Sequence, residues 1–287
     1  MEILHNEPMK NHTTFKIGGA ADIFVTPQNM DELIQIVKDC RTNGTPCFIL
    51  GNGSNLLVSD NGVRGVVISM KALCEIKLLN NNRIYAQAGA MMPDVSKFAH
   101  AHSLCGLEFA EGIPGSIGGG VAMNAGAYGG EMKDVFHVAK LIDKNGQLID
   151  INLDSMNFEY RKSAVQTHGH IVCGVTMQLV PGDKDEIAAL MADYRARRRD
   201  KQPLSMPSAG STFKRPPGHF AGKLIMDAGL RGFSIGGARV SEKHCGFVVN
   251  TGNATAADVL NLIQHVQSVV MEKFGVRLDT EVKMIGE

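Results

Sequence analysis

Residues 112–130 form a glycine stretch with the sequence Gly112-Ile-Pro-Gly-Ser-Ile-Gly-Gly-Gly-Val-Ala-Met-Asn-Ala-Gly-Ala-Tyr-Gly-Gly130. Eight of these 19 residues are glycine and none is charged. Because glycine gives up side-chain packing and costs backbone entropy, such a concentration indicates that bare backbone presses against a flat or bulky group. Peptide N–H groups left pointing outward would suit an anionic or polar ligand. The stretch therefore predicts the wall of a cofactor site.

A second glycine-rich segment lies upstream. Cys47–Leu50 is a short apolar run that predicts a buried strand. The glycine loop that follows, residues 51–55, has the small residues and backbone donors of a diphosphate cradle. It lacks the third glycine and the following helix of the dinucleotide-binding fingerprint. Leu56-Leu57-Val58 and the turn residues 59–62 come next, so loops between strands are expected to hold the ligand.

Composition excludes several classes of protein. The chain has 287 residues, with 29 Lys+Arg and 29 Asp+Glu, so its net charge is zero and no basic field attracts nucleic acid. No apolar run approaches the ~20 residues of a membrane span. The first residues lack the basic and apolar regions of a signal peptide. We expect a cytoplasmic protein of about two domains that binds neither nucleic acid nor membrane.

The cysteines and histidines do not form a metal-binding pattern. No CxxC pair is present, and several of the six cysteines lie in apolar segments, which predicts buried, reduced thiols: Cys40, Cys47, Cys74, Cys105, Cys173 and Cys245. The pairs His100/His102 and His168/His170 are spaced by two, so neither pair shares a helical face. We expect no metal site.

Two helices are predicted strongly in the last third of the chain. Residues 184–199 begin with acidic and end with basic side chains, which complements the helix dipole. Residues 256–274 follow a capping-box-like Thr255 and Asp258, and Gly275 ends them. A strand is expected over 277–285.

Pro181-Gly182-Asp183 is the best candidate for a domain boundary. The arginines at 195 and 197–199 form either a solvated helix end or a contact to a phosphorylated ligand.

Nine motifs in one order resemble a single family. They are HTTFKIGG, GNGSNLL, GLEFAEGIPGSIGGGVAMNAGAYGGE, FEYRKS, AGSTFKRP, AGKLI, GLRG, GGARVSEKHCGFVVN and EVKMIG, between residues 12 and 286. Together they resemble the UDP-N-acetylenolpyruvoylglucosamine reductase (UDP-N-acetylmuramate dehydrogenase) family over nearly the whole chain. Without the long inserted loop whose tyrosine closes over the UDP diphosphate, the chain resembles the shorter subclass.

The resemblance implies an α+β fold. It implies an FAD-binding domain of the vanillyl-alcohol-oxidase (PCMH) type over 1–182, with subdomains of about 1–70 and 71–182. A C-terminal substrate-binding domain over 183–287 would follow. It further implies non-covalent FAD, NADPH as co-substrate, a cytoplasmic role in peptidoglycan precursor synthesis, and a monomer whose partners are small molecules.

The family's reaction has two halves. NADPH gives hydride to the flavin, and reduced flavin then passes hydride to the vinyl CH2 carbon of the enolpyruvyl ether of UDP-N-acetylglucosamine. By resemblance, Arg161 stabilises the charge that develops on the substrate carboxylate, as a planar guanidinium can. Ser211 matches the donor of the proton to the adjacent carbon. Glu281 matches a glutamate that supports the developing enol, and a nearby substrate carboxylate would favour its protonated form.

The resemblance and the two glycine-rich segments also predict binding residues. The expected cofactor-binding residues are Gly51, Asn52, Gly53, Ser54, Asn55, Gly112, Pro114, Gly115, Ser116, Gly118, Gly119, Asn124, Ala125 and Gly126. The expected substrate-binding residues are Tyr160, Lys201 and Tyr128. Tyr128 or the arginines 197–199 would cover the diphosphate. Ser241 and His244 are either near ligand or structural. Arg215 departs from the asparagine that some members have after FK.

Two other functions stay open on the sequence. An oxygen-using oxidase of the same superfamily is one, although many such enzymes attach FAD through a histidine and neither glycine-rich segment contains one. A nucleotide-sugar or flavin-binding protein without catalysis is the other. The joint presence of Arg161, Ser211 and Glu281 argues against it.

Overall fold

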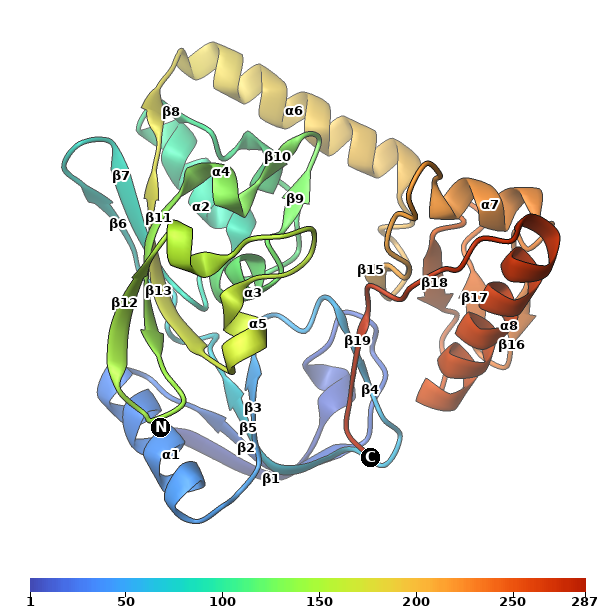
Figure 1. Cartoon of the computed structure of the whole chain (residues 1–287), viewed down its shortest axis with the longest axis horizontal. Helices are drawn as coiled ribbons and strands as arrows, with labels where there is room; N and C mark the ends of the chain where they lie inside the picture. The colour runs from blue at the N-terminus through green and yellow to red at the C-terminus, as the bar shows by residue number, and fades with distance from the viewer. The chain divides into compact units, whose positions relative to one another are not determined.

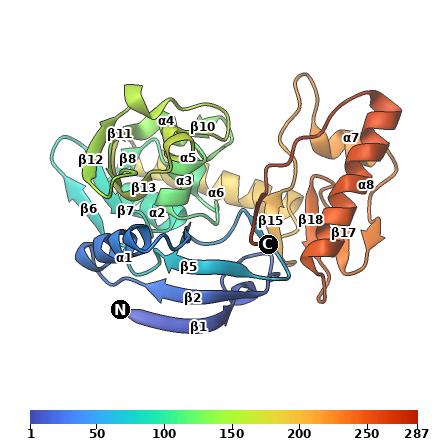
Figure 2. The ribbon, with the colours of Figure 1, turned by 60° about the horizontal axis from the view of Figure 1, so that its bottom comes forward.

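The computed structural model describes residues 1–287, which divide into two compact units. Unit 1 comprises Met1–Ile3, Phe24–Asn52 and Val66–Arg197, and unit 2 comprises Leu4–Ile23, Gly53–Gly65 and Arg198–Glu287. No helix is long and apolar enough to span a membrane. Figures 1 and 2 show the chain from two directions.

An antiparallel five-stranded sheet forms the centre of unit 1 (Figure 1). Its strand order is β12-β11-β13-β7-β6. The bounds are β6 (Ile76–Leu79), β7 (Arg83–Gln87), β11 (Phe136–Ile142), β12 (Leu148–Asn152) and β13 (Ile171–Gln178). The central strand β13 is buried along most of its length, and helix α3 packs on β13 and β7. Residues 80–82 form the turn that joins β6 to β7, with Asn81 and Asn82 in left-handed conformation.

Short elements surround this sheet. The helices of unit 1 are α1 (Met30–Thr42), α2 (Met92–Ala101), α3 (Ile117–Ala122), α4 (Met132–Val135) and α5 (Ala164–His168), with 3-10 turns η2 (Glu108–Ala110) and η3 (Asp154–Met156). Two-stranded pairs join β8 (Leu104–Cys105) to β14 (Val180–Pro181) and β9 (Gly126–Ala127) to β10 (Gly130–Glu131).

A four-stranded sheet has the order β1-β2-β5-β3. Its bounds are β1 (Glu2–Pro8), β2 (Ala20–Thr26), β3 (Cys47–Leu50) and β5 (Val63–Ser69). The predicted strand at Cys47–Leu50 is confirmed, but the prediction that it is buried is wrong except at Leu50. Because β3 is an edge strand, Cys47 is exposed. Cys74 is exposed too, so the expected burial of the cysteines fails at both, although all six thiols are free.

Unit 2 is built on a second sheet, β15-β18-β17-β16. Its bounds are β15 (Ser208–Ser211), β16 (Ser234–Ile235), β17 (Ala238–Val240) and β18 (Phe247–Asn250), with helices α7 (Ala221–Asp227) and α8 (Ala256–Phe274) and the 3-10 turn η1 (Met9–Asn11). Helix α8 packs on β16 and β17 (Figure 1). The buried stripe of α8 fills the core of this unit.

Helix α8 agrees with its prediction at both ends. Thr255 accepts from the Asp258 N–H at 3.0 Å, and Asp258 accepts from the Thr255 N–H at 3.0 Å. Gly275 ends the helix in left-handed conformation. A further cap comes from Asp60, whose carboxylate accepts from the backbone N–H groups of Ala256 and Ala257. The favourable N-terminal dipole explains this long-range contact.

The borders of the units differ from the boundary predicted at 182/183. Helix α6 (Lys184–Lys201) continues into unit 1 as far as Arg197, because Ile187 and Met191 are buried there. Strand β19 (Lys283–Ile285) pairs in parallel with β4 (Leu56–Val58), which brings an N-terminal segment into unit 2. The functional domain limits stay a prediction.

Candidate functional site

The glycine stretch contains a helix, α3, where the sequence predicted outward-pointing backbone. Ser116 caps it, accepting from the Gly119 N–H at 3.4 Å. The N–H groups of Ile117 and Gly118 donate to the carbonyls of Ala90 and Ala88 at 2.8 Å. Those N–H groups are used inside unit 1, so the expectation that the stretch presents them to a ligand is wrong at these positions.

Four of the eight glycines of the stretch are required by the protein's own packing: Gly118, Gly120, Gly126 and Gly130. A Cβ on Gly118 would lie 2.9 Å from the Ala88 Cβ, and one on Gly120 would lie 2.9 Å from the Met92 sulfur. A Cβ on Gly126 would lie 2.6 Å from the Gly130 carbonyl oxygen. Gly119 differs, because its Cβ would meet only the Ser116 hydroxyl, at 3.6 Å. The open side of Gly119 is therefore the place where a flat ligand could approach this backbone.

The residues at the start of the glycine loop lie against this stretch within unit 1. Asn52 Nδ2 donates to the Pro114 carbonyl at 2.7 Å, and a Cβ on Gly51 would lie 2.4 Å from the Ser116 hydroxyl. Ser116 also pairs with Met91 in an isolated bridge. These contacts bring together predicted cofactor residues that are about 60 positions apart in the sequence. The two glycine-rich segments therefore meet at Asn52 and Ser116.

The rest of the glycine loop belongs to unit 2. Gly53 packs so tightly on His12 that a Cβ would lie 2.2 Å from the His12 carbonyl oxygen. Asn55 Nδ2 donates to the Glu281 carbonyl at 3.1 Å, and the Asn55 carbonyl accepts from the Lys283 N–H at 2.9 Å. The loop is thus fixed next to the C-terminal segment that contains Glu281. The strand predicted over 277–285 is correct only at Lys283–Ile285, with one bridge at Thr280.

Ser211 and Glu281 lie on neighbouring extended segments of unit 2. Ser211 ends β15 and pairs with Phe247 in β18. The Glu281 N–H donates to the carbonyl of Thr212 at 2.8 Å, and Phe213 forms a bridge with Thr280. Both Ser211 and Glu281 are half-buried. Lys214 is on the same segment as Ser211, and its backbone N–H donates to the Asp279 carbonyl.

Arg161 occupies a tight turn in unit 1. The backbone groups of Glu159 and Lys162 bond to each other around it, and Arg161 has the left-handed φ of 57°. Its guanidinium donates to the carbonyls of Asn124 and Gly126 at 3.4 and 3.2 Å. It also lies 4.9 Å from the centre of the Tyr160 ring. Arg161 is one of nine non-glycine residues with positive φ, so its hydrogen bonds, and not this conformation alone, distinguish it.

Tyr128 is at the tip of the β9–β10 hairpin and stacks on Tyr194 of α6. Their ring centroids are 4.4 Å apart at an interplanar angle of 10°. The Arg197 guanidinium lies 6.0 Å from both rings and forms an ion pair with Asp193. Tyr194 is not among the residues predicted from the sequence, because only the charges of this helix gave a signal there. Tyr194 thus adds an aromatic side chain beside the residues that are predicted to cover the diphosphate.

The arginine cluster does not form a uniformly solvated helix end. Arg198 is buried, whereas Arg199 is exposed, and Arg195 forms a 2.7 Å ion pair with the buried Glu111. Lys201, the last residue of α6, is exposed. In unit 2, Arg215 stacks over the Phe220 ring at 4.0 Å.

Ser241 and His244 have structural roles in a turn of unit 2. The Ser241 hydroxyl accepts from the N–H groups of Lys243 and His244, and His244 Nδ1 accepts from the Gly246 N–H at 3.1 Å. Burial lowers the pKa of His244. These contacts favour the structural interpretation for both residues.

The lowered pKa of His244 predicts a pH effect on stability. The unfolded chain takes up a proton near pH ~6.5 while the folded chain resists it, so stability is full above that pH and falls below it. His244→Asn, which keeps an acceptor for Gly246, should make the loss of Tm between about pH 7 and pH 5 shallower. The lowered pKa of His170 acts in the same direction, so part of the loss should remain. Identical slopes for variant and wild type would contradict the assignment to His244.

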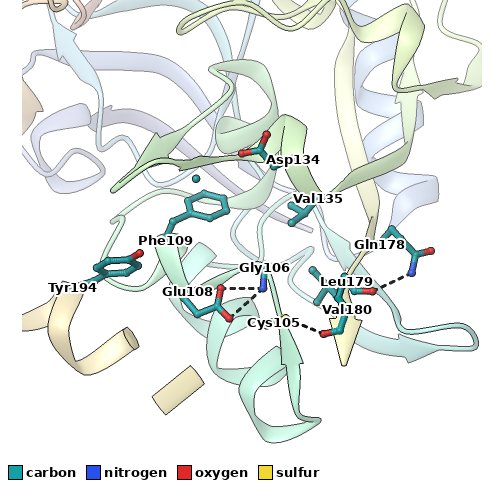
Figure 3. Close-up of a pocket in the computed structure, with 11 residues that line it drawn as sticks. Cys105, Gly106, Glu108, Phe109, Asp134, Val135, Gln178, Leu179, Val180 and Tyr194 are labelled. Carbon is teal, nitrogen blue, oxygen red and sulfur yellow. Dashed lines mark hydrogen bonds between the residues drawn. The ribbon is translucent and has the colours of Figure 1, made fainter. Parts of the chain in front are cut away.

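A cavity of about 290 Å³ in unit 1 shares Gly130 and Tyr194 with the segments described above (Figure 3). Its lining includes none of the predicted site residues. It consists of Cys105, Gly106, Glu108, Phe109, Gly130, Asp134, Val135, Gln178, Leu179, Val180 and Tyr194. Both carboxylates are already engaged: Glu108 accepts from the Gly106 N–H at 2.9 and 3.1 Å, and Asp134 accepts from the Glu131 N–H. We therefore base the candidate site on the glycine-rich segments and not on this cavity. No cluster of three or more potential metal ligands is present.

The family is decided by comparison with known proteins. A UDP-N-acetylenolpyruvoylglucosamine reductase from Caldanaerobacter subterraneus subsp. tengcongensis is 52% identical over 98% of this chain and 93% of its own length. The chain belongs to the UDP-N-acetylenolpyruvoylglucosamine reductase family. A relative of the same name from Clostridium botulinum is 53% identical over 99% of this chain and 93% of its own.

Domain and structure matches agree with this family. Residues 21–152 match an FAD binding domain, and residues 202–285 match the C-terminal domain of UDP-N-acetylenolpyruvoylglucosamine reductase. The crystal structure of the reductase MurB from Thermus caldophilus has a TM-score of 0.84, with 35% identity over 99% of this chain and 98% of that chain. The resemblance and the predicted α+β fold class, an FAD-binding domain followed by the family's C-terminal domain, are confirmed. The chain is an oxidoreductase of this family.

A matched pair of glycine variants tests the cofactor wall. Gly119→Ala should leave the Tm of the apoprotein unchanged or higher, because alanine favours a helix by about 1 kcal/mol. It should weaken FAD binding roughly tenfold, since the new methyl group occupies the open side. Gly118→Ala should instead lower the Tm through its clash with Ala88. Fluorescence titration with FAD measures the first effect, and wild-type affinity in Gly119→Ala would exclude Gly119 from the cofactor contact.

Proposed function

We propose that the chain is an NADPH-dependent flavoenzyme that reduces the enolpyruvyl ether of UDP-N-acetylglucosamine to UDP-N-acetylmuramate. The observation behind the proposal is the near full-length identity to reductases of that name. The order of an FAD binding domain and the family's C-terminal domain supports it. The enzyme acts as a monomer in the cytoplasm, in peptidoglycan precursor synthesis.

FAD bound non-covalently would supply the redox chemistry, taking hydride from NADPH and passing it to the vinyl CH2 carbon. Gly51, Asn52, Pro114, Ser116 and Gly119, which lie close together in unit 1, would hold it. Gly53, Ser54 and Asn55 complete the glycine loop, and the remaining predicted residues of the stretch support its backbone. The Asn124 side chain is fully buried and bonded within the protein, so its contribution would come from the main chain.

Side chains of the protein would stabilise the negative charge that develops on the substrate and would supply the proton. Arg161 offers a planar guanidinium to the substrate carboxylate, where negative charge grows as hydride arrives at the neighbouring carbon. Ser211 gives its hydroxyl proton to the carbon that bears the carboxylate. Glu281 supports the developing enol through a hydrogen bond. Tyr160, Lys201 and Tyr128 hold the substrate, with Tyr128 over the diphosphate.

The visible spectrum of the purified protein tests the proposal. Under anaerobic conditions, a flavin absorbance should bleach when NADPH is added and return when the enolpyruvyl UDP-sugar is added. Mass analysis of the product should show two added hydrogens. NADH in place of NADPH and UDP-N-acetylglucosamine in place of the substrate serve as controls.

Two other results would support different functions. A flavin that bleaches but recovers only with oxygen would indicate an oxidase. A protein that takes up no added FAD, or one that binds FAD and the sugar without any turnover, would reject the proposed catalysis.

A further inference from the structure

Asn124 connects three segments of unit 1 through a side chain with no solvent exposure. Its Nδ2 donates to Glu131 Oε2 at 2.6 Å and to the Glu159 carbonyl at 3.2 Å. Its Oδ1 accepts from the Lys133 N–H at 3.0 Å. These bonds use both donor positions and one acceptor position of the amide. A buried amide satisfied in this way fixes the relative positions of the segments that it joins.

The same three segments determine where the Arg161 guanidinium lies. Two of its hydrogen bonds go to the carbonyls of Asn124 and Gly126, so this backbone acts as its cradle. Glu159, held by Asn124, is the first residue of the turn that places Arg161 in its left-handed conformation. The Asn124 side chain thus supports both the cradle and the turn.

Glu131 is the charged partner in this arrangement. It is opposite Gly126 in the β9–β10 pair, so its backbone and its side chain both act on the cradle. The hydrogen bond from Asn124 to its carboxylate is short, as expected when the acceptor is ionised. The other carboxylate oxygen pairs with Lys133 at 2.6 Å, where the lysine side chain is exposed. One oxygen of the Glu131 carboxylate therefore accepts from Asn124 and the other pairs with Lys133, and the side chain also accepts from the Asp134 N–H to cap α4.

We propose that Asn124 and Glu131 are positioning residues for Arg161, fixing its guanidinium where the substrate carboxylate binds. The inference rests on the proposed function, in which Arg161 stabilises charge in the second half-reaction. Neither side chain needs to touch the substrate. A displacement of about 1 Å at a charge-stabilising group can slow a reaction about 100-fold, so loss of the Asn124–Glu131 bond should appear in rate more than in stability.

A reversed hydrogen bond tests the proposal. Asn124→Asp places a second carboxylate against that of Glu131 and so replaces the hydrogen bond with repulsion. It should slow the reoxidation of flavin by the enolpyruvyl sugar about 100-fold, with little change in flavin reduction by NADPH. Adding Glu131→Gln gives an amide that can donate to the carboxylate introduced at position 124, and the double variant should recover roughly tenfold of the lost rate. Lys133→Met, which removes only the surface ion pair, should behave as wild type. Stopped-flow absorbance measures both half-reactions separately.

Each result has a definite meaning. Equal slowing of both half-reactions, or no recovery in the double variant, would overturn the positioning role. If Asn124→Asp does not fold, Glu131→Leu alone decides, because leucine removes the acceptor of the Asn124 hydrogen bond. Wild-type reoxidation in that variant would overturn the role, and selective slowing would support it. A wild-type protein whose reduced flavin does not respond to the sugar would overturn the proposed function and this inference together.

Discussion

Replacing Ser211 with alanine is expected to leave flavin reduction by NADPH nearly intact and to slow the transfer to the enolpyruvyl sugar about a thousandfold. The substitution removes a single hydroxyl group from a half-buried position. The backbone pairing between Ser211 and Phe247 does not depend on that hydroxyl, so β15 should keep its geometry. Loss of the proton donor should therefore affect only the step in which carbon is protonated.

Ser208→Ala is a matched control in the same strand. Ser208 contacts Thr14 through its carbonyl, which the substitution keeps. It should change neither half-reaction. Ser211→Cys keeps an acidic proton and should be intermediate between alanine and wild type. Equal damage to both half-reactions in Ser211→Ala would show that Ser211 is not the proton donor.

Local sequence signals predicted the regular elements well. Helix α8 matches its predicted bounds, because a capping box, a buried stripe and a terminal glycine all act within the segment itself. The strand Leu56–Val58 follows the glycine loop, as the short apolar run in the sequence indicates. Short-range chemistry is visible in a single sequence.

Helix α3 could not be predicted in this way. Three consecutive glycines disfavour a helix, and each costs about 1 kcal/mol relative to alanine. The helix forms because Ser116 caps it and because only glycine fits against Ala88 and Met92 at residues 118 and 120. Those neighbours belong to other elements, so tertiary packing overrides the local preference.

Long-range pairing also explains the missed borders and the missed site partners. The pairing of β4 with β19 joins residues more than 200 positions apart and has no local signature. The Tyr128–Tyr194 stack and the bond between Asn52 and Pro114 arise in the same way. Resemblance to a family supplied candidate residues, whereas the structure supplied the groups that hold them.

Substitution of Arg161 should also slow the reaction strongly, and it should do so with little effect on stability. Arg161→Lys should slow the reoxidation of flavin by the enolpyruvyl sugar about 100- to 1000-fold, the usual cost of losing one charge-stabilising group. A lysine ammonium keeps the charge but cannot reach two carbonyls and a carboxylate with one planar fork. Flavin reduction by NADPH should stay near the wild-type rate in stopped-flow measurements.

Arg161→Gly completes the test. Glycine accepts the left-handed conformation without the ~1 kcal/mol cost that other residues bear, so the turn itself should be as stable as in wild type or more so. The variant should lose the second half-reaction with only a small change in Tm, because relief in the turn offsets the loss of the hydrogen bonds to the Asn124 and Gly126 carbonyls. Lys162→Met, next to it in the chain, removes only an exposed pair with Glu159 and should be silent. Full turnover in Arg161→Lys or Arg161→Gly would mean that the strained turn has a purely structural origin, and the catalytic assignment of Arg161 would be lost.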